Sequence, residues 1–506
     1  MYDLIIKGAF ILDGTGADGY ISDVAVKDGK IARIDKEISG DGEIINAEGL
    51  TLSPGWIDSH SHSDKQFLTY PEMREKVEQG ITFSIAGQCG GSAAPSVKDG
   101  NLKKMSEYLR EVSDLPQGSG AATLVGFNTV RKAVMGSENR DPTPEELEKM
   151  KDLVRDAIRG GAIGMSYGIF YVPVCYARTE ELVAVAKVVK EEGGLLAAHI
   201  RGESDNLIES VAEYLHIVRE SGCKAVLSHH KACRKENWGK VRTTVEMIEA
   251  LNREGGDVYF DVYPYTATST SMMSTFCPSN FHPKGTTSAL SLLYDSEICK
   301  KIKAWGEEKW HNDISWTFVT FCKGHPELVG KTVSEIAREL GREDDELEVA
   351  LDIIRMGEGR ANACYFSINE EDMKFVMSHP RAMICTDSGV AGASTVYHPR
   401  LRGSFPRALA YAREGVTSIP EMIRKMTSLP AEVYGLKSKG LIKEGMDADI
   451  CIFDAEKIRD GSDFVNCTLP NEGLSYVIVN GKIALVNNEA NGVMAGKIYI
   501  RKNEVR

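Results

Sequence analysis

Short runs of alternating apolar and polar residues open and close the chain. Within residues 1–55, the stretches DLIIKGAFILDG, DVAVKDGKIARI and GEIINAEGLTLSPG alternate in this way and are separated by turn residues. From about residue 440, LIKEGMDADICIFDA, LSYVIVNGKIALVNNEA and GKIYIRK repeat the pattern. Neither end has enough strands to close a stable sheet alone, so we expect residues 1–55 and 436–506 to build one small β-sandwich together.

Between the two ends, apolar strand-like runs alternate with helix-like stretches. The runs are residues 56–63, 82–89, 122–128, 162–168, 195–201, 224–230, 257–264 and 382–389. The helices carry start signals: Thr143 is placed to cap a helix that begins at Pro144, and Glu146 completes a capping box. This alternation predicts an α/β fold, a (β/α)8 TIM barrel over residues 56–435. An open doubly wound sheet is the alternative, but the sequence lacks the glycine-rich phosphate loop expected after its first strand.

One connection is much longer than a crossover helix requires, because the seventh run ends at residue 264 and the eighth begins at residue 382. Its part at about 272–335 is rich in Phe, Met and Trp and is expected to form an insertion between barrel strands 7 and 8. Two interpretations stay open. The insertion is either a structural addition or a wall over the barrel mouth, where long excursions of such barrels reach the site.

Composition and charge restrict the class of function. The 506 residues exceed the size at which one core stops growing, which agrees with a large domain and a smaller companion. A net charge of −13 argues against a nucleic-acid-binding surface and favours a small-molecule substrate. We find no apolar run that could span a bilayer and no signal-peptide pattern, so we expect a cytoplasmic protein that is not bound to membranes. The sequence does not indicate an oligomeric state.

Potential metal ligands gather at the carboxyl ends of the expected strands. The first strand ends in His60 and His62, and because residues i and i+2 of a strand share a face, both imidazoles should point into the barrel mouth. The second, fifth, sixth and eighth strands end in Cys89, His199, the His229–His230 pair and Asp387. Each residue alone fits a buried core position or a helix cap. Their common placement at the end where barrel enzymes carry out catalysis predicts a metal-dependent active site.

These motifs carry a resemblance: the whole chain resembles the amidohydrolase superfamily and, within it, the N-acyl-D-amino-acid deacylases (D-aminoacylases). The matching motifs follow the family's order and are PGWIDSHSHSD, GQCGGSAAP, YVPVCYARTEEL, AAHIRGE, LSHHK, DVYPYTA, CTDSG, HPRLRGSFPR, RKMTSLPAEVYGL and KGLIKEGMDADICIFD. Many relatives in the superfamily hold two metals with a carboxylated lysine, whereas the deacylase pattern uses a bridging cysteine. Cys89 in the second-strand motif therefore favours the deacylases.

The resemblance implies roles for individual residues. It implies a tightly held zinc ion on Cys89, His199 and His229, and a weaker second site on His60, His62, Cys89 and Asp387. The family pattern keeps the first histidine of the doublet, which leaves His230 as a structural neighbour. Asp387 would be the general base. Candidates for binding the substrate's α-carboxylate are Lys231, Tyr171 and Arg407, while Arg201 and Glu203 would support the ligand His199.

The activity that the resemblance implies is zinc-dependent hydrolysis of an N-acyl-D-amino acid to a carboxylic acid and a free D-amino acid. Selectivity for the D-isomer follows from the resemblance alone. The nearest alternative is a cyclic amidase such as a hydantoinase or dihydroorotase, which would be expected to show the carboxylated-lysine pattern. A non-catalytic scaffold of the same fold is a further alternative. Such a scaffold would be expected to have lost ligands, and all six expected positions are filled.

Overall fold

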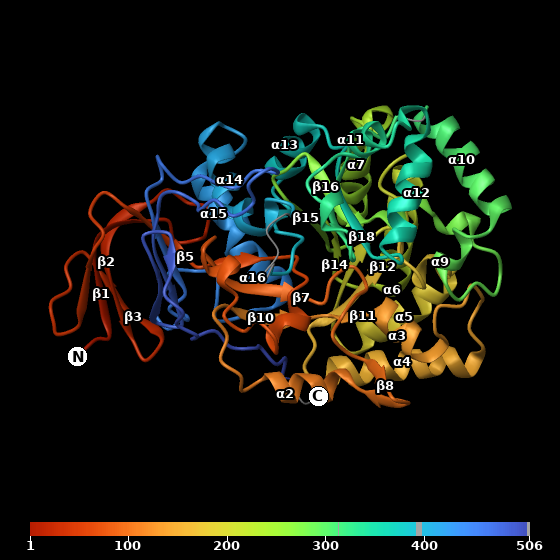
Figure 1. Ribbon diagram of the computed structural model, residues 1–506. Coiled ribbons are helices and arrows are strands. Elements are labelled where there is room, and N and C mark those ends of the chain that lie inside the picture. Colours follow the sequence, from red (N-terminus) through yellow and green to blue (C-terminus); the bar gives the residue numbers. More distant parts are fainter. Residues whose placement is uncertain (312, 391–396, 503–506) are drawn as a thin grey trace.

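The two ends of the chain meet in one nine-stranded sheet. The computed structural model describes residues 1–311, 313–390 and 397–502. The strands of this sheet are β1 (Leu4–Ile11), β2 (Tyr20–Lys27), β3 (Lys30–Asp35), β4 (Glu43–Asn46), β5 (Thr51–Pro54), β20 (Ile450–Phe453), β21 (Leu474–Val479), β22 (Lys482–Val486) and β23 (Glu489–Ala490). Strand β5 pairs antiparallel with β20, which joins the strands from the start of the chain to those from its end (Figure 1). Alternating residues such as Ile6, Ile11 and Ile450 share one buried core.

Parallel strands occupy the middle of the chain. Strands β6 (Trp56–Asp58), β7 (Ile81–Ala86) and β10 (Gly120–Thr123) form one sheet, and a second sheet contains β11 (Val125–Gly126), β12 (Gly164–Gly168), β13 (Leu195–His199), β14 (Ala225–Leu227), β15 (Val258–Val262) and β19 (Ala382–Ile384). All neighbours in these two sheets run parallel. The first and last of them approach each other, because the backbone N–H of Ser59 donates to the carbonyl of Ile384 at 3.4 Å. The carboxyl ends of β6 and β19 therefore lie close together.

Helices alternate with these strands along the chain. They are α1 (Arg74–Val77), α2 (Met105–Val112), α3 (Phe127–Met135), α4 (Pro144–Arg159), α5 (Thr179–Glu191), α6 (Leu207–Ser221), α7 (Lys240–Arg253), α13 (Glu370–Ser378), α14 (Arg400–Arg413), α15 (Ile419–Met426) and α16 (Ser428–Tyr434). The start predicted for α4 is confirmed: the Thr143 hydroxyl accepts from the Glu146 backbone N–H, and the Glu146 carboxylate accepts from the Thr143 backbone N–H. Among the described residues, none of the helices is both long and apolar enough to cross a bilayer.

A separate unit lies between β15 and β19. It contains β16 (Ala267–Ser271), α8 (Met272–Phe276), α9 (Ala289–Leu292), α10 (Ser296–Trp310), β17 (Thr317–Cys322), α11 (Val333–Glu339), α12 (Glu346–Met356) and β18 (Ala361–Phe366). Strand β18 is the centre of a three-stranded antiparallel sheet, between β16 and β17. Since this central strand comes last in sequence, the unit runs beyond the expected 272–335. We call residues 267–366 the insertion; its apolar residues pack into a core of their own.

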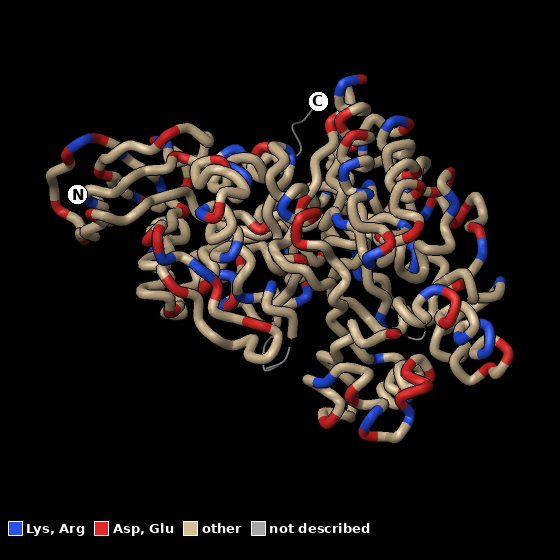
Figure 2. The backbone as a smooth tube through the Cα atoms, turned by 90° about the horizontal axis from the view of Figure 1, so that it is seen from above, with Lys and Arg blue, Asp and Glu red and all other residues tan. Residues whose placement is uncertain are grey.

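Shorter elements complete the chain. Strands β8 (Ser96–Lys98) and β9 (Asn101–Lys103) form a two-stranded hairpin. Single turns of 3-10 helix are η1 (Asp64–Phe67), η2 (Val174–Tyr176), η3 (Lys235–Asn237), η4 (Ser279–Phe281), η5 (Pro326–Leu328) and η6 (Glu343–Asp345). Figure 2 shows that acidic and basic residues are mixed along the backbone as seen from above.

Candidate metal centre

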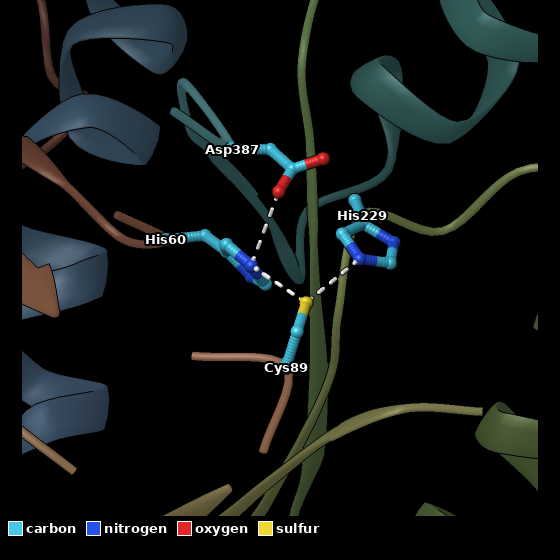
Figure 3. Close-up of side chains that lie close together, drawn as sticks. All are labelled: His60, Cys89, His229 and Asp387. Carbon is cyan, nitrogen blue, oxygen red and sulfur yellow. Dashed lines mark hydrogen bonds and ion pairs between the residues drawn. The ribbon is translucent and has the colours of Figure 1, made fainter. Parts of the chain in front are cut away.

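Four of the predicted ligands, His60, Cys89, His229 and Asp387, converge beyond the carboxyl ends of the parallel strands (Figure 3). The Cys89 Sγ, just after β7, lies 3.3 Å from His60 Nε2 and 3.3 Å from His229 Nε2. It also lies 3.7 Å from His199 Nδ1, and that nitrogen is 3.0 Å from His229 Nε2. The structure thus brings Cys89, His199 and His229 together as one group centred on the sulfur.

A second group forms around Asp387, which follows β19. Its Oδ1 lies 3.4 Å from His60 Nε2 and 3.0 Å from His62 Nε2. Strand β6 ends at Asp58, so both histidines lie just beyond it, on either side of Ser61, which forms an isolated parallel bridge with Ser388. Their rings meet edge to face, with centroids 5.3 Å apart, and both reach the same carboxylate.

Three of these residues have a left-handed backbone. The φ angles of Cys89, His229 and Asp387 are 51°, 35° and 46°, a region that residues other than glycine rarely adopt. Each follows a buried parallel strand, where the chain turns sharply outward. Such strain is retained at positions where the surrounding structure fixes a functional side chain. Here the sharp turns direct the sulfur, the imidazole and the carboxylate towards one another (Figure 3).

Two further carboxylates contact His60 and His229 on the side of each ring that faces away from the cluster. Asp261 Oδ1 accepts from the backbone N–H of His229 at 2.6 Å and lies 3.5 Å from His60 Nδ1. Glu203 Oε1 lies 3.0 Å from His229 Nδ1. Carboxylates in contact with the far nitrogen of a ligating imidazole fix the orientation of the ring. In both histidines, this leaves Nε2 facing the cluster.

The electrostatics of the cluster favour a thiolate beside a carboxylate. Burial alone would raise the pKa of the Cys89 thiol, but His60 and His229 lower that pKa well below its usual value. Burial would likewise raise the pKa of Asp387, and Arg400 with His229 instead holds it well below the ordinary value. Both shifts favour the ionised form, which is the state in which sulfur and carboxylate bind a cation.

The donor atoms suit zinc. His60, Cys89, His229 and Asp387 each offer a ligand atom, and these atoms all lie within 4.8 Å of one another. Two ligand atoms bound to one tetrahedral zinc at ~2.0–2.3 Å lie roughly 3.3–3.7 Å apart. The distances of 3.0 to 3.7 Å among Cys89, His199 and His229 are close to that spacing. A buried set of sulfur and imidazole nitrogen is also the ligand chemistry that zinc prefers.

His230, the other member of the doublet, takes no part in this cluster. Its Nε2 lies 2.9 Å from the Thr244 hydroxyl, and its ring packs edge to face on Phe260. Burial lowers the pKa of His230 to about 3, so the ring is neutral. It behaves as a packed core residue, and the turn after β14, rather than strand alternation, separates it from His229.

A cavity of about 1070 Å³ opens at the cluster and is lined by His62, Cys89, His199, His229, Asp387, Tyr171, Lys231 and Arg400, among others. The Tyr171 hydroxyl lies 3.0 Å from the Thr270 hydroxyl of the insertion. The Lys231 ammonium lies 2.6 Å from Glu203 and 2.8 Å from His229 Nδ1. Of the two residues expected to support His199, Arg201 pairs with Glu213 at 2.8 Å, whereas Glu203 contacts the cluster itself.

Arg407 does not reach this cavity. Its guanidinium pairs with Asp460 at 3.1 Å and lies over the ring of Tyr265. The basic residue of α14 that lines the cavity is Arg400, two helical turns earlier, which the sequence analysis missed. Residues seven apart share a helix face, but the rise of about 1.5 Å per residue moves Arg407 roughly 10 Å along the axis. The motif HPRLRGSFPR contains both arginines, and the sequence does not indicate which of them lines the cavity.

Comparison with known proteins identifies the family of the chain. The sequence model of the amidohydrolase family matches residues 43–485. D-aminoacylase from Alcaligenes xylosoxydans xylosoxydans is 31% identical and covers 99% of this chain and 98% of its own length. N-acyl-D-aspartate deacylase from the same organism is 32% identical, with 95% and 91% covered. The chain therefore belongs to the amidohydrolase family, in its D-aminoacylase branch.

A solved structure shows the same relationship in three dimensions. N-acyl-D-glutamate deacylase from Bordetella bronchiseptica superposes with a TM-score of 0.86 at 31% identity, covering 99% of this chain and 100% of that one. That enzyme was solved with zinc and with a phosphonate inhibitor that mimics the tetrahedral intermediate. The overall fold is thus the α/β fold of D-aminoacylase-type amidohydrolases.

Proposed function

We propose that this protein is a zinc-dependent hydrolase that converts N-acyl-D-amino acids to a carboxylic acid and a free D-amino acid. The observation that carries the proposal is the buried cluster of Cys89, His60, His229 and Asp387 at the base of the cavity. The relatives of similar identity act, by their names, on D-amino-acid derivatives. A cyclic amidase is the weaker candidate, because here a cysteine occupies the centre of the ligand set.

Six residues would hold the metal. Cys89, His199 and His229 would form the tight site, and a weaker site would use His60, His62, Cys89 and Asp387. When bound, zinc supplies Lewis-acid chemistry that makes an amide carbonyl susceptible to attack by water. The carboxylates of Asp261 and Glu203 keep the ligand rings oriented, so that the cluster is assembled before substrate enters.

Asp387 is the residue that we assign to proton transfer. Its carboxylate is ionised, and it lies at the edge of the cavity with 8% of its surface exposed. In this position it accepts a proton from the attacking water and delivers it to the nitrogen that leaves as the free amine. His62 and His60 contact Oδ1, whereas Oδ2 faces Arg400.

Arg400 and Lys231 are the cations that we assign to the substrate's α-carboxylate, with Tyr171 on the same cavity wall. Arg400 Nε has no hydrogen-bond partner among the described residues, so this buried guanidinium retains donor capacity for a ligand. The Lys231 ammonium, in contrast, already contacts Glu203, His229 Nδ1 and the His229 carbonyl. Arg400 is therefore the principal carboxylate ligand and Lys231 an auxiliary one. A planar guanidinium also suits a carboxylate geometrically.

We also propose the finer architecture. The parallel pairings and the contact between Ser59 and Ile384 support a closed (β/α)8 barrel over residues 56–435. The sheet shared by both ends supports a β-sandwich of residues 1–55 and 436–506. A cytoplasmic location is proposed from the sequence alone.

Metal analysis combined with a substrate screen tests the proposed function. We expect at least one zinc per chain in the purified protein, hydrolysis of N-acetyl-D-amino acids and much slower hydrolysis of the L-isomers. Preferential opening of hydantoin or dihydropyrimidine rings would identify a cyclic amidase instead. A protein without bound zinc or amide hydrolysis would support the non-catalytic scaffold.

A further inference from the structure

The cavity is larger than a short N-acyl amino acid requires. Cavities of roughly 300–1,000 Å³ enclose drug-sized ligands, and this one measures about 1070 Å³. Its inner part holds the ligand cluster with Lys231 and Arg400, which suffices for the amide and the carboxylate. The insertion and the loops after β12, β13 and β14 share the remaining wall. The residues that line this second part of the cavity therefore determine which substituent of a substrate the site accepts.

Four aromatic side chains of the insertion line that part, and we call Trp305, Trp310, Trp316 and Tyr365 the aromatic wall. Their rings touch in sequence: the centroid of Trp310 is 4.7 Å from that of Trp305 and 5.8 Å from that of Trp316. Trp316 is in turn 5.7 Å from Tyr365. Edge-to-face contacts of this kind fix the rings relative to one another, so the wall is a preformed apolar surface.

The core of the insertion supports the wall from behind. Phe276 lies 5.4 Å from Trp310 and packs nearly parallel to Trp316 at 6.3 Å. Phe281 meets Trp305 at 5.8 Å. Trp310 and Tyr365 are buried, whereas Trp305 and Trp316 are only partly covered by other residues and line the cavity. The two partly covered indoles are the surfaces that a ligand would cover.

The charged groups beside the wall already have partners. Arg234 lies with its guanidinium 5.8 Å from the Trp310 ring and donates to the Lys309 carbonyl at 2.6 Å. The Lys309 ammonium pairs with Asp205 at 3.0 Å. These contacts join the insertion to the loops after β13 and β14. Beside these paired cations, the indole rings of Trp305 and Trp316 offer apolar surface to the cavity.

We propose that the preferred substrates carry a bulky aromatic or similarly large apolar substituent, which packs against the aromatic wall while the amide lies at the metal cluster. This inference rests on the proposed function and names its substrate class. The substituent belongs either to the amino-acid side chain or to the acyl group. Both sources present the same chemistry to Trp305 and Trp316. Under this proposal, the insertion is a specificity wall over the active site and not only a structural addition.

A matched substrate series on the zinc-loaded, full-length protein tests the inference. N-acetyl-D-alanine is the small reference, N-acetyl-D-tryptophan carries the bulk on the side chain, and N-phenylacetyl-D-alanine carries it on the acyl group. N-acetyl-D-glutamate tests for an acidic side chain. We expect kcat/KM for at least one bulky substrate to exceed that for the reference about tenfold or more, which is the range that apolar pocket contacts supply. The substrate that shows the gain identifies the end that meets the wall.

Substitutions then assign the gain to the wall. Trp305→Ala and Trp316→Ala are expected to lower the ratio of kcat/KM for the bulky substrate to that for N-acetyl-D-alanine about tenfold. Trp238→Ala is the control, because Trp238 is 40% exposed and lies outside the cavity lining. It should leave the ratio unchanged.

The outcomes separate the inference from the proposed function. If the protein hydrolyses all four substrates but N-acetyl-D-alanine or N-acetyl-D-glutamate equals or exceeds both bulky ones, the inference is overturned and the proposed function stands. Retention of the full ratio in both tryptophan variants overturns it as well. If none of the four is hydrolysed by zinc-loaded protein, the proposed function fails and the inference with it. The series on the unsubstituted protein decides the matter even if a tryptophan variant does not fold.

Discussion

Arg400 and Asp387 form a buried ion pair at the edge of the metal cluster, with Arg400 Nη1 2.8 Å from Asp387 Oδ2. The two residues come from different parts of the fold: Asp387 follows β19, and Arg400 begins α14. The guanidinium also lies over the ring of Tyr263, with 4.6 Å to its centroid. The residue assigned to proton transfer and the residue assigned to carboxylate binding are therefore in direct contact. This contact explains why substrate binding and chemistry should depend on the same pair.

Replacement of Cys89 by alanine is expected to abolish tight zinc binding. Its sulfur lies within 3.7 Å of three imidazole nitrogens and is the softest ligand in the set. Elemental analysis of the purified variant, with far-UV circular dichroism as a check on folding, measures the effect. Cys223→Ala is a suitable control, because Cys223 is buried and does not line the cavity. Zinc content equal to that of the unsubstituted protein in Cys89→Ala would remove the sulfur from the site.

Asp387→Asn should fold and keep zinc at the tight site while losing most of its turnover. The amide preserves the shape of the carboxylate but cannot take up the proton of water. Loss of a general base typically lowers kcat about 10²–10⁴-fold. The prediction is checked by kcat on N-acetyl-D-amino acids at saturating zinc, together with metal content. A decrease below about tenfold would reassign Asp387 to metal binding alone.

Arg400→Met is predicted to lower kcat/KM selectively for substrates that have a free carboxylate. Loss of Arg400 also removes the partner of Asp387, so kcat/KM should fall for both substrate types. A charge-assisted hydrogen bond contributes roughly 1.5–3 kcal/mol, so the fall for N-acetyl-D-amino acids should exceed that for their amides about ten- to a hundredfold. Lys231→Met is the comparison. Because the Lys231 ammonium also contacts Glu203 and His229, its loss should affect charged and neutral substrates more evenly. Equal losses on both substrate types in Arg400→Met would exclude the guanidinium from carboxylate binding.

A change at the start of α4 tests a purely structural assignment. Thr143→Ala removes the hydroxyl that accepts from the Glu146 backbone N–H, and is expected to lower the free energy of unfolding by about 1 kcal/mol. Thr243→Ala, at an exposed interior position of α7, removes no cap and should leave stability unchanged or slightly raised. Thermal denaturation of both variants gives the comparison. Catalysis should be unaffected in either, since both positions lie on helices outside the cavity lining.

Local pattern and motif were enough to identify the class of the protein and the set of candidate ligands. Residues that follow buried parallel strands necessarily emerge at the same end of the sheet, so Cys89, His199, His229 and Asp387 were recognisable from their positions along the chain. The capping box of α4 is similarly local, since Thr143 and Glu146 are three residues apart. In each case the information lies within a few residues of the position concerned.

Only the tertiary structure decided which groups meet. The left-handed turns at Cys89, His229 and Asp387 aim three side chains at one point, and no strand or helix periodicity encodes such a turn. Arg400 rather than Arg407 lines the cavity because of where α14 begins relative to β19, and that depends on packing across the whole fold. The aromatic wall likewise exists only because β18 returns to pair with β16 and β17 and closes the insertion. Long-range packing determines these relationships, whereas the sequence by itself determined the elements and the chemistry available to them.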